Sequence, residues 1–185
     1  FAIGGDMVTG EIHEELGKTN DLAIMPSVYE CYGLLRWCIS TLAERFGKVR
    51  VPCVTGNHGR VTHKIQSKDR SYTNYEWLVY RFLADHFAND SRVTFDIADG
   101  ADVHYEVYGT RYLLTHGDSA KGGSGVSGIY YPLSRLYGDK LQQYARIGKP
   151  FDTLVCGHWH CYNHTSRFIV NGSLIGVSEY GWGRS

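Results

Sequence analysis

The feature that most constrains the fold of this chain is a set of short apolar runs that each end in a turn residue followed by a polar side chain. The runs are "AIGG", "PCVTG", "YLLT" and "TLVCG", and the side chains that follow them are Asp6, Asn57, His116 and His158. An apolar run of this length bounded by a turn residue is typical of a buried β-strand. Functional side chains gather at the carboxyl ends of strands in α/β sheets. We therefore expect these four residues, together with His160, to converge on one site.

Helical segments alternate with these runs in the first half of the chain. Residues 27–48 and 71–87 place apolar side chains three or four positions apart, which predicts two amphipathic helices. Ser27 is expected to cap the first of them. Residues 128–148 predict a third helical region, broken near Pro132 and Gly138.

The rhythm then changes to short strands. Residues 92–98, 102–109 and 110–118 predict an antiparallel meander, and a hairpin around Asn171 and Gly172 is expected near the end. The predicted fold class is α/β, a mixed β-sheet sandwich flanked by helices, in one domain over residues 1–185. The glycine-rich loop 118–128 is suited to face a substrate.

Composition excludes several classes of protein. The 185 residues carry a formal net charge of zero, so no global basic field indicates a nucleic-acid binder, although a local patch stays open. No apolar stretch approaches the ~20 residues that span a bilayer, so we expect no membrane association. The five cysteines include no CxxC pair, which argues against a structural zinc site and predicts reduced thiols in a cytoplasmic protein. The first residue is Phe1 rather than Met, so a lost leader stays open.

Four motifs in order carry a resemblance to a known family. "GD" at 5–6, "GNH" at 56–58, "THGD" at 115–118 and "GHWH" at 157–160 resemble those of the calcineurin-like metallophosphoesterases. The ending "VNGSLIGVSEYG" at 170–181 resembles the bacterial and phage-type members. The resemblance implies a four-layer αββα fold around a dinuclear metal centre.

The resemblance also implies a role for each matching residue. Asp6 matches the carboxylate that bridges the two metals, and Asn57 matches an amide-oxygen ligand of the second metal. His116 and His158 match imidazole ligands of that second metal, and His160 matches a ligand of the first. His58 matches a histidine that binds no metal and protonates the leaving-group oxygen or stabilises its charge.

These roles imply a hydrolase that uses two divalent metal ions. Two cations about 3.5–4 Å apart clamp a phosphoryl group, and a bridging hydroxide acts as the nucleophile. Mixed oxygen and imidazole ligands favour manganese, with iron, zinc and nickel as alternatives. The expected substrate is a phosphodiester or phosphomonoester, with a nuclease or phosphodiesterase favoured and a nucleic acid or nucleotide as the partner. A homo-oligomer stays open.

Two departures from the family pattern matter. The DxH motif is absent, so we expect a domain truncated at its N-terminus and a first metal position held only by Asp6 and His160. His13, His63 and Asp118 are the first candidates to replace the missing ligands.

The second departure follows His58, where the family often has a carboxylate and this chain has Gly59 and Arg60. Asp118 or another group must then orient His58. Arg60 and Asp118 are the candidate substrate-binding residues. Arg60 is either a phosphate ligand or a solvated loop residue. Two other functions stay open: a metal-binding regulatory module that lost catalysis, and a structural domain whose histidines are incidental.

Overall fold

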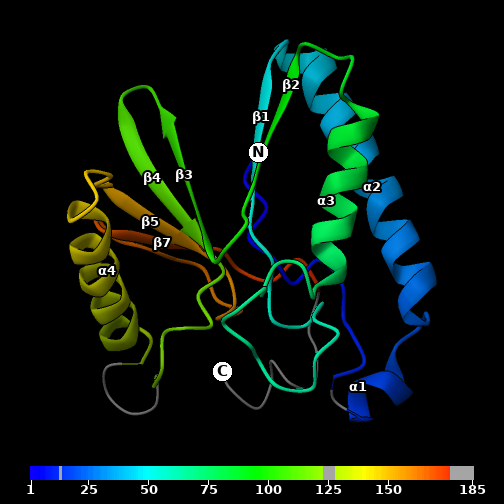
Figure 1. Cartoon of the computed structure of the whole chain (residues 1–185), viewed down its shortest axis with the longest axis horizontal. Helices are drawn as coiled ribbons and strands as arrows, with labels where there is room; N and C mark the ends of the chain where they lie inside the picture. The colour runs from blue at the N-terminus through cyan, green and yellow to red at the C-terminus, as the bar shows by residue number, and fades with distance from the viewer. Residues whose placement is uncertain (13, 123–127, 176–185) are drawn as a thin grey trace. The chain divides into compact units, whose positions relative to one another are not determined.

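The structure is a computed structural model that describes residues 1–12, 14–122 and 128–175. The chain divides into two compact units, Phe1–Val103 and His104–Ser185 (Figure 1). Each unit has its own strands, helices and buried core. The prediction of one domain over the whole chain stays a prediction.

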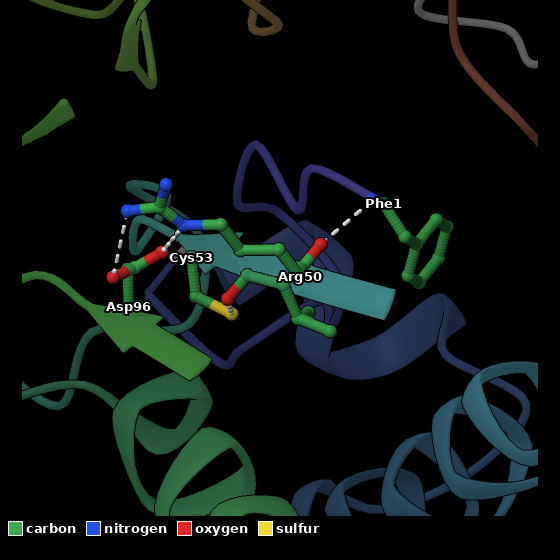
Figure 2. A network of polar contacts seen from close by, with 5 residues as sticks. Phe1, Arg50, Cys53 and Asp96 are labelled. Carbon is green, nitrogen blue, oxygen red and sulfur yellow. Dashed lines mark hydrogen bonds and ion pairs between the residues drawn. The ribbon is translucent and has the colours of Figure 1, made fainter. Parts of the chain in front are cut away.

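The first unit is built on a pair of parallel strands, β1 and β2, in which Val51 is in register with Phe95. Its elements in chain order are α1 (Glu14–Thr19), α2 (Ile24–Phe46), β1 (Val49–Cys53), α3 (Tyr75–His86) and β2 (Val93–Ile97). Arg50 of β1 and Asp96 of β2 form a two-bond ion pair, with Nε–Oδ2 at 2.5 Å and Nη2–Oδ1 at 3.2 Å (Figure 2). Because both side chains are partly exposed, this pair contributes little stability, about 0–1 kcal/mol.

Helices α2 and α3 lie side by side and cover the strand pair (Figure 1). Leu35 and Ile39 of α2 meet Val79 and Leu83 of α3 in one core with Val51, and none of these is more than 5% exposed. A fully buried aliphatic side chain of this size stabilises the fold by roughly 1.5–3 kcal/mol. None of the helices that the structure describes is long and apolar enough to cross a membrane.

The second unit is built on a mixed sheet with the strand order β3-β4-β5-β7-β6. Its elements are β3 (Asp102–Val107), β4 (Thr110–Thr115), α4 (Tyr130–Ala145), β5 (Thr153–Cys156), β6 (Asn163–His164) and β7 (Phe168–Val170). Strand β5 pairs in parallel with both β4 and β7, and β6 pairs antiparallel with β7. Leu133 and Leu136 of α4 join Leu113, Leu154 and Phe168 in its core. The predicted α/β class, with a mixed sheet and flanking helices, is confirmed; the four-layer arrangement stays a prediction.

The predicted three-stranded meander is wrong in its first strand. Strand β2 pairs with β1 in parallel, whereas β3 and β4 are neighbours in the other sheet, joined by Tyr108 and Gly109. Both turn residues have positive φ, 49° and 82°, as a two-residue hairpin turn requires. The "DGA" segment after β2 therefore connects two sheets, which local sequence does not distinguish from a hairpin.

Three smaller predictions also differ from the structure. Helix α2 begins after Ala23, without a side-chain cap, and the Ser27 hydroxyl inside it donates to the Leu22 carbonyl at 3.4 Å. Helix α4 runs unbroken because Pro132 lies in its first turn, where no intrahelical N–H bond is lost. No strand follows Gly172 in the described residues up to 175.

Parts of two further predictions lie outside the described residues. The substrate-facing loop 118–128 includes 123–127, and the family-like ending 170–181 includes 176–181; neither stretch is described. The antiparallel pair that the structure does describe near the end is β6 with β7. On its other side β7 pairs in parallel with β5, with Val155 in register with Ile169.

The cysteines give a direct test of the two cores. All five are free, and burial raises the pKa of the Cys31 and Cys156 thiols to about 12 and that of Cys53 further. The thiolate fraction of these three is therefore small at pH 8, and their sulfurs are shielded. We expect Cys38 and Cys161, which are half-buried, to react first with a thiol reagent.

The measurement is the time course of labelling by Ellman's reagent at pH 8, with and without denaturant. Two thiols should react quickly in the native protein, and five should react in denaturant. Five equal rates in the native protein would contradict the cores, and fewer than five in denaturant would contradict free thiols.

Candidate metal centre

The predicted ligands of the first unit lie on a pair of loops that follow two paired segments of that unit. Ile3 donates its N–H to Pro52 O at 2.9 Å, and Val54 donates to Ile3 O at 3.0 Å. The loops that follow touch at two glycines, since a Cβ on Gly5 or on Gly56 would overlap atoms of the other loop. Asp6 and the Asn57–His58 pair are thereby brought together.

A hydrogen bond to the Asp6 carboxylate fixes the second of these loops. Asp6 Oδ1 accepts the His58 backbone N–H at 2.8 Å. The guanidinium of Arg60 donates to the carbonyls of Asn57 and His63, the latter at 3.1 Å. Arg60 therefore holds the loop backbone, and its predicted contact with a phosphate stays a prediction.

Behind both loops lies a buried carboxylate, Glu76, in the first turn of α3. Its Oε1 accepts the Met7 N–H and its Oε2 accepts the Gly56 N–H, each at 2.7 Å, and the residue is 0% exposed. Asn74 caps the same helix by accepting the Glu76 N–H at 2.9 Å, and its Nδ2 donates to Gly56 O at 2.9 Å. The start of α3 is thus bonded to the backbone on which Asp6 and Asn57 lie.

The predicted ligands of the second unit include a pair of neighbouring histidines. His116 is buried directly after β4, and His158 follows β5, with their ring centroids 5.1 Å apart at an interplanar angle of 72°. One ring nitrogen of each lies within 4.8 Å of the other. The Gly157 N–H donates to His116 O at 3.0 Å and locks the two strand ends together. Two neighbouring imidazole nitrogens of this kind are candidate ligands of one divalent ion.

Backbone strain is concentrated on predicted ligands. Of the five described non-glycine residues with positive φ, three are Asp6 (55°), His158 (67°) and His160 (54°); the others are Asp69 and Tyr108. A non-glycine residue in this region typically costs about 1–3 kcal/mol and persists where the surroundings demand it. Such strain favours a functional role for the loops that carry these side chains.

His158 and His160 are an i, i+2 pair, a spacing that on a strand would place both side chains on one face. Strand β5 instead ends at Cys156, and both histidines lie in the bend that follows, His158 half-buried and His160 exposed. Among the described residues, no ring nitrogen of His160 lies within 4.8 Å of the ring nitrogens of both His116 and His158. Its role as a ligand stays a prediction.

The convergence of all the predicted ligands also stays a prediction, because Asp6 and Asn57 lie in the first unit and the three histidines in the second. Asn57 and His58 are half-buried, as is Asp118. Among the candidate replacement ligands, His63 is exposed and His13 lies outside the described residues.

Sequence reasoning missed Glu76 and Asn74. A signal was present, because Glu76 lies three, four and seven residues before Val79, Tyr80 and Leu83 and so shares their apolar face. A carboxylate at a core position of a helix is rarely buried unless it is bonded.

Comparisons with known proteins leave the family unassigned. No protein-family model matches the chain, and no curated protein matches it. Among solved structures, wild-type Vps29 from Entamoeba histolytica complexed with zinc has a TM-score of 0.35 and 15% identity. The alignment covers 72% of this chain and 64% of that one, so the chain spans just under two thirds of it.

Two mutant forms of the same protein are similar at the same level. A single mutant has a TM-score of 0.35 and 17% identity, covering 77% of this chain and 68% of that one. A double mutant has a TM-score of 0.33 and 16% identity, covering 72% and 63%. Similarity of this degree assigns no function to the chain.

Gly117 offers a test of the histidine pair. Its φ is 108°, and a Cβ there would lie 3.3 Å from Cys156 Cβ and from Gly157 O. Gly122 has a similar φ of 100° with nothing within 4 Å, so Gly122→Ala is a matched control for backbone strain alone. We expect Gly117→Ala to be more destabilising than Gly122→Ala, by about 1–3 kcal/mol, because it also pushes β4 from β5.

Denaturant unfolding of both variants measures this difference. Equal losses of unfolding free energy in the two variants would show that the ends of β4 and β5 can move apart to accommodate a Cβ at residue 117.

Proposed function

We propose that this chain is a metal-dependent phosphoesterase whose second metal position is held by Asp6, Asn57, His116 and His158. The observation that carries the proposal is the pair of buried His116 and half-buried His158, which follow the ends of two adjacent parallel strands. The strained backbone of Asp6 and His158 supports it. The order of the motifs supplies the remaining residues of the proposal.

The donor set fits a divalent transition metal. Two imidazoles, one carboxylate and one amide oxygen suit manganese, iron or zinc better than magnesium. When bound, such an ion polarises a phosphoryl oxygen and lowers the pKa of a water molecule toward neutrality. We propose two ions, with His160 and Asp6 serving the first, and manganese as the preferred metal.

The chain's own residues supply orientation and a proton. Asp6 binds the His58 N–H through Oδ1, so the carboxylate and the backbone of the proposed acid are held at a fixed separation. His58 in its protonated form would give its ring proton to the leaving-group oxygen as the P–O bond breaks. Gly56 allows the tight approach because any Cβ there would overlap Asp6.

We propose a phosphodiester, such as a nucleic acid or a dinucleotide, as the substrate class. The zero net charge means that affinity would come from the site rather than from a global basic field. Hydrolysis of bis-p-nitrophenyl phosphate, a mononucleotide and single-stranded DNA, each with manganese and with a chelator, would rank the substrates.

A second candidate is a metal-binding regulatory module without catalysis. Residue 59 is glycine, so the family-type carboxylate beside His58 is missing. The adjacent Arg60 donates to backbone carbonyls. Metal binding without hydrolysis of any of the three substrates would favour this function.

Removal of a histidine from the pair tests the metal site. We expect His116→Ala and His158→Ala each to weaken manganese binding by more than the ~10–100-fold that loss of an outer-shell partner costs. His164→Ala, at an exposed histidine on β6, is the control and should bind as the wild type does. Calorimetric titration measures all three, and unchanged affinity in both site variants would remove the basis of the proposal.

Removal of His58 tests the proposed proton donor. We expect His58→Ala to lower kcat by about 10²–10⁴ with metal content nearly unchanged, because a general acid contributes to the reaction and not to the metal shell. Steady-state kinetics and elemental analysis on the same sample give both numbers. A variant that loses its metal would show that His58 is a ligand instead.

A further inference from the structure

A carboxylate that is 0% exposed needs a physical reason, and Glu76 is such a group. Burial of an ionised side chain costs several kcal/mol unless hydrogen bonds offset it. Glu76 shares the helix face of Val79 and Leu83, where an apolar residue would pack without that cost. The position therefore serves something other than packing.

We propose that Glu76 is a positioning residue that sets the separation of Asp6 from Asn57 and His58 and thereby shapes the metal centre. The inference rests on the proposed function. The two backbone amides that Glu76 binds are those of Met7, directly after Asp6, and of Gly56, directly before Asn57. Each carboxylate oxygen binds one loop at 2.7 Å, so one rigid planar group ties the two loops together.

Further hydrogen bonds at the start of α3 connect the same helix turn to the Asn57–His58 loop. Asn74 bonds the Glu76 N–H and also the Gly56 carbonyl, each at 2.9 Å. The Tyr75 N–H donates to Gly59 O at 2.9 Å, on the far side of His58. The residues before and after Asn57 and His58 are therefore both bonded to the first turn of one helix. The positive end of the helix dipole also lies at this turn, which favours an anionic side chain there.

The same contacts explain the glycine after His58. A Cβ on Gly59 would lie 2.6 Å from Asn74 Oδ1 and 3.0 Å from Glu76 Cγ. Glu76 and Asn74 thus fill the space that any side chain at residue 59 would need. Glu76 therefore positions the Asn57–His58 loop from α3, whereas the family pattern often places a carboxylate at the residue after His58.

Two variants of Glu76 separate the effect of side-chain length from the effect of side-chain charge. Glu76→Gln keeps the length but places an amide NH₂ against a backbone N–H, and Glu76→Asp keeps the charge but is one methylene short of binding both loops. The matched control is Tyr80→Phe on the same helix face: Tyr80 is 0% exposed and its hydroxyl donates to Val54 O at 3.2 Å, before the loops begin. All three variants lose a buried hydrogen bond and should be less stable than the wild type.

The experiment compares manganese affinity by calorimetry, kcat on bis-p-nitrophenyl phosphate and melting temperature in the full-length protein, at a temperature where every variant is folded. We expect both Glu76 variants to bind manganese ~10–100-fold more weakly, as loss of a group that orients metal ligands does, with a reduced kcat. Tyr80→Phe should lower the melting temperature while affinity and kcat stay within twofold. Glu76→Asp carries the test where Glu76→Gln does not fold.

Three results would overturn the inference. Wild-type affinity and kcat in a destabilised Glu76→Gln would make Glu76 purely structural, and full function in Glu76→Asp would show that charge rather than reach matters. An equal loss of affinity in Tyr80→Phe would show that any damage to α3 disturbs the site. In these cases the proposed function stands, whereas a wild type that neither binds manganese nor hydrolyses the ester overturns the proposed function and this inference with it.

Discussion

The close backbone approach of two loops at Gly5 and Gly56 is the constraint on which the candidate site in the first unit depends. Neither residue has room for a Cβ, so the loops meet at main-chain distance and Asp6 reaches the His58 N–H. The second unit uses the same device at Gly117, which lets the end of β4 lie against the end of β5. In both units glycine removes the spacing that side chains would impose between strand ends.

Such contacts hold strained loops only because each unit is rigid beneath them. Positive φ at Asp6 or His158 costs about 1–3 kcal/mol, of the order that one buried aliphatic side chain contributes. The core of α2, α3, β1 and β2 supplies many such side chains under the first loops. The burial of these side chains therefore offsets the cost of positive φ in the loops at the strand ends.

Much of this arrangement could be predicted from local sequence. Apolar runs that end in glycine or threonine predicted where β1, β4 and β5 stop, and helical spacing predicted α2, α3 and α4 within a few residues. These features depend on the chemistry of neighbouring residues. The partner of β2 could not be predicted in this way, because β2 pairs with β1, a strand that lies before α3 in the chain, rather than with its sequence neighbour β3. The bend after Cys156, in which both His158 and His160 lie, could not be predicted because an i, i+2 spacing fits a strand equally well.

Glu76 shows what a pattern search for ligands leaves out. Motifs select side chains that touch a metal or substrate, whereas Glu76 binds the backbone amides of Met7 and Gly56 and belongs to no motif. In the sequence, Glu76 is a charged residue on the otherwise apolar face of α3. Such an exception to the apolar pattern is expected at functional sites. The two amides that Glu76 binds are adjacent to Asp6 and Asn57. The buried carboxylate therefore indicates the same two loops that the apolar runs indicated. A group that supports ligands can therefore be found by asking which residues violate the burial pattern of their own helix, with no reference to the site.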